Sequence, residues 1–306
     1  MIAFLIKRFV WLLLTLWIVF TISFFLMRAA PGGPFSSERK LTPDVKRAME
    51  KEYRLDKPIY WQYGDRLWRT FRWWDLGKST KLKDFTVNEV IRAGFPVSAT
   101  LGLVALIFAL SLGLTAGIIS ALYRQTVLDV SLIAIATIGI AVPNFWLASV
   151  GIIISVFYLQ LLPAAGWGTL SNVILPALCL GAPYAAYIAR LTRTGMLDVL
   201  NQDYIRTARA KGLPSYKIVI HHALKGAVLP VVSFMGPATA GILTGSLVLE
   251  SMFNIPGMGT HFIEAAFQRD YPMAMGVVLV YTLLLYSMNT LVDISYSLLD
   301  PRVKLD

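Results

Sequence analysis

Sixty consecutive residues of this 306-residue chain, Val130 to Ala189, contain no Lys, Arg, Asp or Glu. Two further runs, Gly226–Leu249 and Tyr271–Val292, are also free of charge. A helix needs about 20 apolar residues to cross the hydrocarbon of a bilayer, and a soluble core does not require several such runs. Only 15% of the residues are charged, against about 25% in soluble domains. The pattern therefore predicts an integral membrane protein.

The fold class that follows is an all-α membrane protein. Lipid offers backbone groups no hydrogen bonds, and the apolar segments lack the alternation of a barrel strand. We expect six membrane-spanning helices, at about 9–27, 98–122, 128–158, 173–189, 227–249 and 276–299. The third is overlong and contains Pro143, which removes a backbone donor, so we expect an interruption there, as one kinked helix or as two pieces. Pro237 predicts a local break in the fifth.

These spans divide the chain into four parts: an N-terminal anchor helix at 1–27, an external loop region at 28–97, a five-helix core at 98–299 and a tail at 300–306. The core includes a loop at 190–226. Basic residues precede the first apolar run, as in a signal peptide, but that run is too long and "MRAAPGG" is a poor cleavage site. We therefore expect a retained anchor.

The distribution of Lys and Arg predicts that both termini are cytoplasmic. With the N-terminus inside, the inner segments hold twelve Lys and Arg residues, whereas the short outer loops at about 159–172 and 250–275 hold only Arg269. The 28–97 region is longer than the loops to which the rule applies. The loop at 190–226 then faces the cytoplasm.

The external region carries 15 basic and 9 acidic residues. Pro58 can start a helix, and aromatic or small residues fall near one face of it: Tyr60, Trp61, Gly64, Trp68, Phe71 and Trp74. Two interpretations stay open, a helix lying on the membrane surface and a small packed subdomain. "GKST" at 77–80 is not a phosphate loop, because Arg72 stands where the pattern needs glycine.

Several function classes find no support in the residues. There is no His-Glu-x-x-His or Gly-x-Ser-x-Gly motif, and the adjacent His221 and His222 make a poor metal pair. The single cysteine, Cys179, excludes an internal disulfide. The spans offer no convincing midplane acid for an ion-coupled carrier. Small residues spaced by four, at 113 and 117 and at 241 and 245, favour close helix contacts within the chain or at a subunit seam.

One polar segment interrupts the apolar chain, "DYIRTARAKGLP" at 203–214. Asn201 or Asp203 can cap a short helix, in which Ile205 and Ala208 share a face. Gly212 can adopt the left-handed conformation that ends a helix, with Leu213 folding back and Pro214 preventing continuation. Ser215 can cap a second helix that leads into the fifth span. The segment is either a lever that moves this span or a basic loop that binds anionic lipid.

The segment "YIRTARAKGL" resembles the cytoplasmic loop of permease subunits of ABC importers, specifically those of the dipeptide/oligopeptide family. Further stretches that resemble the family are "SFFLMRAAPGGPF", "RLDKPIYWQY", "FPVSATLG", "GSLVLESMFNIPGMG", "RDYPM" and "LVDISYSLLDP". The chain departs from the general loop pattern, Glu-Ala-Ala-x3-Gly, since Arg206-Thr207-Ala208 replaces Glu-Ala-Ala, but it matches the peptide-importer variant. The "APGGPF" and "FPVSA" stretches are most similar to those of the B-type subunit of oligopeptide importers.

The resemblance implies a type I ABC importer permease fold and a bacterial inner-membrane subunit that transports oligopeptides by alternating access. It implies a homologous second permease, two ATP-binding subunits and an external peptide-binding protein, with ATP and Mg on the partners and no cofactor on this chain. It implies an ATPase-coupling surface made of Asp203, Tyr204, Ile205, Arg206, Thr207, Ala208, Arg209, Ala210, Lys211 and Gly212. Neither catalysis by this chain nor nucleic-acid binding is expected, and dipeptides, glutathione or a metal chelate are alternative substrates. A secondary carrier and a membrane enzyme are the competing classes.

Overall fold

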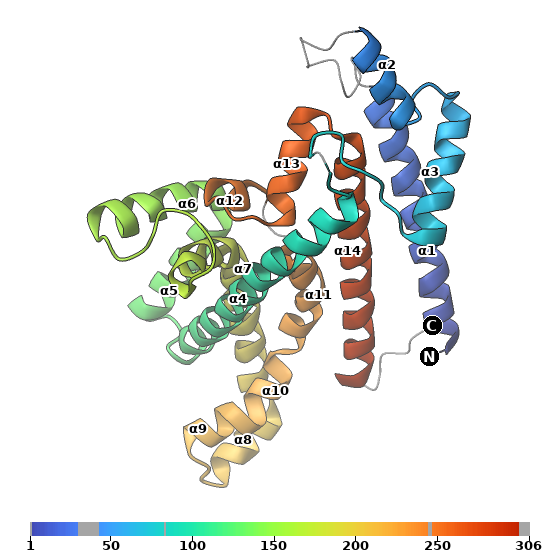
Figure 1. Ribbon diagram of the computed structural model, residues 1–306. Coiled ribbons are helices and arrows are strands. Elements are labelled where there is room, and N and C mark those ends of the chain that lie inside the picture. The colour runs from blue at the N-terminus through green and yellow to red at the C-terminus, as the bar shows by residue number, and fades with distance from the viewer. Residues whose placement is uncertain (1, 30–42, 83, 244–246, 300–306) are drawn as a thin grey trace. The chain divides into compact units, whose positions relative to one another are not determined.

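The computed structural model describes residues 2–29, 43–82, 84–243 and 247–299 (Figure 1). Apart from one isolated antiparallel bridge, between Lys78 and Thr86, the regular structure of this part is helical. The chain forms two compact units. The N-terminal unit comprises Ile2–Val97 and Pro256–Leu284, and the central unit comprises Ser98–Ile255 and the end of the chain from Leu285.

The N-terminal unit is built on α1 and the helices that follow it. Its elements are α1 (Ile2–Ala29), α2 (Pro43–Glu52), α3 (Ile59–Trp73), the beginning of α4 (Val87–Leu122), α13 (Met258–Gln268) and the first part of α14 (Tyr271–Leu299). Phe20 and Phe24 of α1 are fully buried, and the Tyr63 ring of α3 packs edge-on against Phe24 with centroids 5.3 Å apart. The same apolar core takes in Val87 and Met273 from α4 and α14.

The predicted aromatic helix is present as α3, which begins directly after Pro58. Tyr63, Leu67 and Thr70 lie on its inner side, and Thr70 is buried, whereas Tyr60, Trp61 and Trp68 are exposed. The helix is therefore part of a packed unit and also presents an aromatic face outward. That this face lies on a membrane surface stays a prediction.

The central unit is organised around α7 (Leu170–Leu200), which contacts α5, α6, α10 and α11. The helices of this unit, besides the parts of α4 and α14, are α5 (Val127–Ala141), α6 (Asn144–Ile152), η1 (Ile153–Tyr158), α8 (Asp203–Ala210), α9 (Ser215–Lys217), η2 (Ile218–Ala223), α10 (Leu224–Ala227), α11 (Leu229–Leu243) and α12 (Leu247–Met252). In Figure 1 α8 and α9 lie at the same end of this unit, beyond α10.

Glycines allow α4 and α7 to approach closely. A side chain at Gly113 would meet the carbonyl oxygen of Ala185 at 2.7 Å, and one at Gly117 would meet that of Ala189 at 2.6 Å. The first predicted pair of small residues thus packs within the chain. Gly241 contacts Tyr184, and position 245 lies outside the described residues.

The described chain contains five helices long and apolar enough to cross a membrane, or six if α5 and the α6–η1 segment count as one span. The axes of these two segments differ by 107° at Pro143, which confirms the predicted interruption as two pieces. The break predicted at Pro237 is wrong, because α11 continues through it. Proline is tolerated inside spans where neighbouring groups satisfy the freed carbonyl. Helix α4 likewise contains Pro96, and it begins at Val87, earlier than the predicted start at residue 98.

Candidate functional site

Helix α8 has one buried side and one exposed side. Ile205 is completely buried and Ala208 is 6% exposed, as their three-residue spacing predicts. The outer side of the predicted segment is exposed and carries Asp203, Tyr204, Arg206, Thr207, Arg209, Ala210, Lys211 and Gly212. The ten residues therefore form one continuous structural feature, with an apolar base and a polar, mainly basic surface.

The base of α8 rests on a small apolar cluster contributed by four other elements. Ala121 comes from the end of α4, Met196 from α7, Ile218 from η2 and Ala227 from α10. Ile205 and Ala208 complete this cluster. Only Asn201 and Gln202 separate α7 from α8, so the chain offers little slack between them. The position of α8 is therefore tied to the ends of the helices beneath it.

The start of α8 differs from the prediction. The N-cap is Gln202, whose side chain makes no capping hydrogen bond, so Asn201 and Asp203 are not the cap. Asn201 instead donates from Nδ2 to the carbonyl of Leu197 at 2.9 Å and thereby completes the last turn of α7. Asp203 lies in the first turn, where its charge suits the helix dipole. Its ion pair with Arg206, at 3.3 Å, is exposed and contributes little.

The end of α8 is a Schellman motif, as the Gly-Leu-Pro sequence predicts. Gly212 has a φ of 76°, its N–H donates to the Arg209 carbonyl at 2.9 Å, and the Leu213 N–H donates to the Ala208 carbonyl at 3.3 Å. Leu213 also packs against the apolar cluster. This helix ending fixes the backbone that carries the exposed side chains of Arg209 and Lys211.

The second helix begins at Ser215, but Ser215 is not its cap. Pro214 occupies the N-cap position, and its carbonyl accepts hydrogen bonds from Lys217 and Ile218. The helix continues as η2, a π-helix, and α10, and leads to α11. His221 and His222 are exposed, and no group of three potential metal ligands occurs in the described part of the chain.

An ion pair with a buried carboxylate, which sequence reasoning missed, ties α5 to α7 near this end. Arg193 donates from Nε and Nη2 to the two oxygens of Asp129, both at 2.8 Å. The carboxylate also accepts hydrogen bonds from the Ser120 hydroxyl of α4 and the Gln125 backbone N–H. The Asp129 side chain is 4% exposed, and its contacts join the end of α4 and the start of α5 to α7. The Thr126-x-x-Asp129 pattern marks the start of α5, but it does not indicate the pairing with Arg193.

A close backbone contact joins α7 to α10. A side chain at Gly195 would lie 2.3 Å from the carbonyl oxygen of Ala227, so only glycine allows this approach.

Comparison with known families covers nearly the whole chain. Residues 113–305 match the family "Binding-protein-dependent transport system inner membrane component", and residues 1–101 match its N-terminal companion, "Binding-prot-dependent transport system membrane comp, N-term". The chain is therefore a multi-pass inner-membrane permease subunit of a binding-protein-dependent transporter. Such a permease implies ATPase and binding-protein partners, and it lacks ATPase activity of its own.

Curated relatives define the family further. The chain is 44% identical to the dipeptide transport system permease protein DppB of Bacillus subtilis, over all of this chain and 99% of that protein. It is 43% identical to the oligopeptide transport system permease protein OppB of Salmonella typhimurium, over 99% of this chain and all of that protein. The chain belongs to this OppB/DppB family of peptide ABC importer permeases, as its sequence stretches predict.

Solved structures agree on the fold. A chain of the MetNI methionine ABC transporter, in an inward-facing conformation, superposes with a TM-score of 0.58. The match covers 69% of this chain and 96% of that chain, at 18% sequence identity. The ABC importer permease fold is thereby confirmed.

Proposed function

We propose that this chain translocates oligopeptides by alternating access, driven by ATP hydrolysis on partner subunits that push on α8. The observation that carries the proposal is the two-sided build of α8: its base is buried against α4, α7, η2 and α10, while its polar side is exposed. Closure of the ATPases on ATP would shift α8 and, through that base, the helices of the central unit. Arg206, Arg209 and Lys211 would make the polar contacts.

The assembly that fits this role contains a homologous second permease, two ATP-binding subunits and an external peptide-binding protein. ATP and Mg would be held by the ATP-binding subunits. Membership of the OppB/DppB family supports this composition. A basic helix that merely binds anionic lipid would not need the buried base and fixed ends of α8.

Both termini and α8 are assigned to the cytoplasmic side. The support is the Lys and Arg distribution, with twelve such residues in the inner segments and only Arg269 in the short outer loops. The 28–97 region and α13 would then be external, where a binding protein delivers its cargo.

The substrate class is assigned to oligopeptides on the B-type sequence features of the chain. Relatives named for dipeptides and for oligopeptides have nearly equal identity to the chain, so dipeptides, glutathione or a metal chelate remain the alternative.

The test is reconstitution of the chain with its partner permease, ATP-binding subunits and binding protein in proteoliposomes, with peptides of graded length. The proposal predicts that peptide uptake requires ATP and persists when an ionophore collapses the ion gradients. It also predicts uptake of peptides longer than two residues. Uptake that follows a proton or sodium gradient without ATP would contradict it and favour a secondary carrier. ATP-driven uptake restricted to dipeptides would retain the mechanism and replace the substrate.

A further inference from the structure

The N-terminal unit contains a cavity of about 380 Å³ at the ends of two candidate spans. Phe24 and Arg28 line it from the last turns of α1, and Tyr271 and Met275 line it from the first turns of α14. The ends of spans lie at the depth of the lipid headgroups. The volume is in the range of small-ligand sites.

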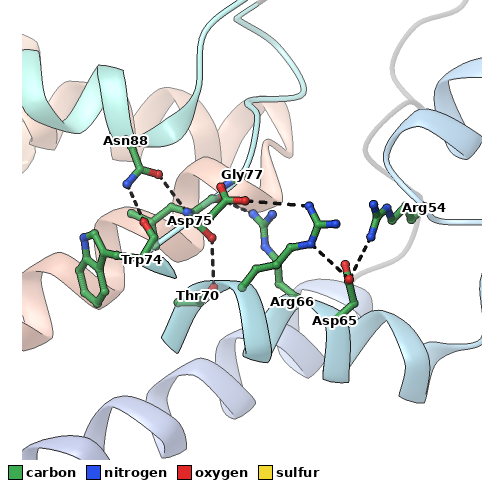
Figure 2. A network of polar contacts seen from close by, with 10 residues as sticks. Arg54, Asp65, Arg66, Thr70, Trp74, Asp75, Gly77 and Asn88 are labelled. Carbon is green, nitrogen blue, oxygen red and sulfur yellow. Dashed lines mark hydrogen bonds and ion pairs between the residues drawn. The ribbon is translucent and has the colours of Figure 1, made fainter. Parts of the chain in front are cut away.

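Most charged side chains that line this cavity form ion pairs with one another. Its basic side chains are Arg28, Arg54, Arg66, Arg69 and Lys78, and its acidic ones are Glu52, Asp65 and Asp75. Arg54 and Arg69 both donate to Asp65, at 2.9 and 3.2 Å, and Figure 2 shows Arg54 and Asp65 turned toward each other. Arg69 reaches Asp75 at 4.0 Å, and Lys78 reaches Glu52 at 3.7 Å. Three of the five basic side chains thereby form ion pairs with all three carboxylates.

Two arginines have only neutral hydrogen-bond partners. Within the described part of the chain, Arg28 donates to the Gln62 side chain at 2.7 Å, and Arg66 donates to the Leu76 carbonyl; neither makes an ion pair. Burial lowers the pKa of the Arg66 guanidinium, and the more distant charge of Asp75 offsets part of that effect. A guanidinium has five N–H donors and stays charged in proteins, so both groups retain donors for a further acceptor. Both side chains are partly buried, and the Arg28 guanidinium also stacks on Phe24, 3.6 Å from the ring centroid. Charges removed from water are normally paired with an opposite charge.

A hydroxyl group at the same cavity also lacks a partner. Thr80 is 8% exposed, and its buried Oγ1 makes no hydrogen bond to the described residues. Its backbone is held in place, because the Thr80 N–H and the Ser79 hydroxyl both donate to Asp270. Buried polar atoms are almost always hydrogen-bonded, so this hydroxyl indicates a missing hydrogen-bond partner.

We propose that this cavity binds the phosphate group of a membrane phospholipid through Arg28, Arg66 and the Thr80 hydroxyl. A phosphate carries several acceptor oxygens and matches the forked donors of arginine. The position at span ends favours a lipid over a soluble anion. Exposed Trp61 and Trp68 on α3 favour it too, because tryptophan prefers the headgroup layer. This inference is independent of the transported substrate.

The experiment titrates the delipidated, full-length chain in detergent and follows its thermal stability. The probes are short-chain phosphatidylglycerol, the same diacylglycerol without phosphate, and inorganic phosphate. We expect stabilisation by the phosphatidylglycerol only. Arg28→Gln should weaken its binding about tenfold or more, since a charged hydrogen bond is lost. Thr80→Val should weaken it about threefold and leave the lipid-free stability intact. The matched control is Arg72→Gln on the exposed side of α3, which should bind as the wild type does.

Equal lipid affinity for wild type, Arg28→Gln and Thr80→Val would overturn the proposal. If Arg28→Gln does not fold, Thr80→Val decides alone. Inorganic phosphate that binds as tightly as the lipid and displaces it would make the site one for free phosphate and overturn the lipid assignment. Equal stabilisation by diacylglycerol would show that the acyl chains alone bind.

Discussion

Removal of the Ile205 side chain beyond Cβ is the sharpest perturbation of α8. Ile205 is completely buried, and Ala208 is the only other buried residue of the helix, so Ile205→Ala removes most of the apolar base. Large-to-small changes at such sites cost about 2–5 kcal/mol. Even about 2 kcal/mol corresponds to about a 30-fold fall in the ratio of docked to undocked α8. The chain should still insert, because the spans do not depend on this contact.

The assay is the reconstituted complex, with peptide uptake and ATP hydrolysis measured on the same proteoliposomes. We expect Ile205→Ala to lower uptake per ATP hydrolysed, by up to about 30-fold. The control is Ile220→Ala, the same chemical change at a side chain of η2 that is 56% exposed, and it should behave as the wild type does. Wild-type uptake per ATP in Ile205→Ala would refute the idea that the base of α8 transmits motion.

Three further changes test neighbouring features. Gly212→Val should lower both co-purification with the ATPase subunits and peptide uptake. A φ of 76° strains a β-branched residue by about 1–2 kcal/mol, although the added Cβ would meet nothing within 4 Å. The control Gly212→Asn tolerates this conformation and should retain both. Asp129→Asn should lower thermal stability in detergent by about 2 kcal/mol, because Arg193 loses a charged partner, and unchanged stability would argue against a structural ion pair. Gly195→Ala should lower the Tm and uptake together, since its Cβ would lie 2.3 Å from a backbone oxygen of α10; a wild-type Tm would mean that α7 and α10 do not pack as described.

The sequence predicted the features of this fold that local chemistry determines. Uncharged runs predict spans because hydrocarbon excludes charge, and the Gly212-Leu213-Pro214 order predicts the end of α8 because each residue acts on its own backbone. The amphipathic face of α8 follows from a three-residue spacing in the same way.

Features that depend on distant partners were not predicted. Asp129 directly precedes the sixty-residue uncharged run, and Arg193 lies just after it, yet nothing local indicates that the two pair. The Asn201 side chain bonds back to α7, so the expected cap of α8 was wrong. The unpartnered Thr80 hydroxyl likewise becomes visible only once residues of α1, α3 and α14 surround one cavity.

Cross-linking from α8 in the assembled transporter tests the central claim most directly. In a Cys179→Ala background, a cysteine replaces either Arg209 on the exposed side of α8 or Phe267 of α13, which is 85% exposed. The account predicts that a short bismaleimide joins position 209 to an ATP-binding subunit, with a yield that changes when ATP binds, and does not join position 267. Absence of any cross-link from 209, or the same link from 267, would contradict it.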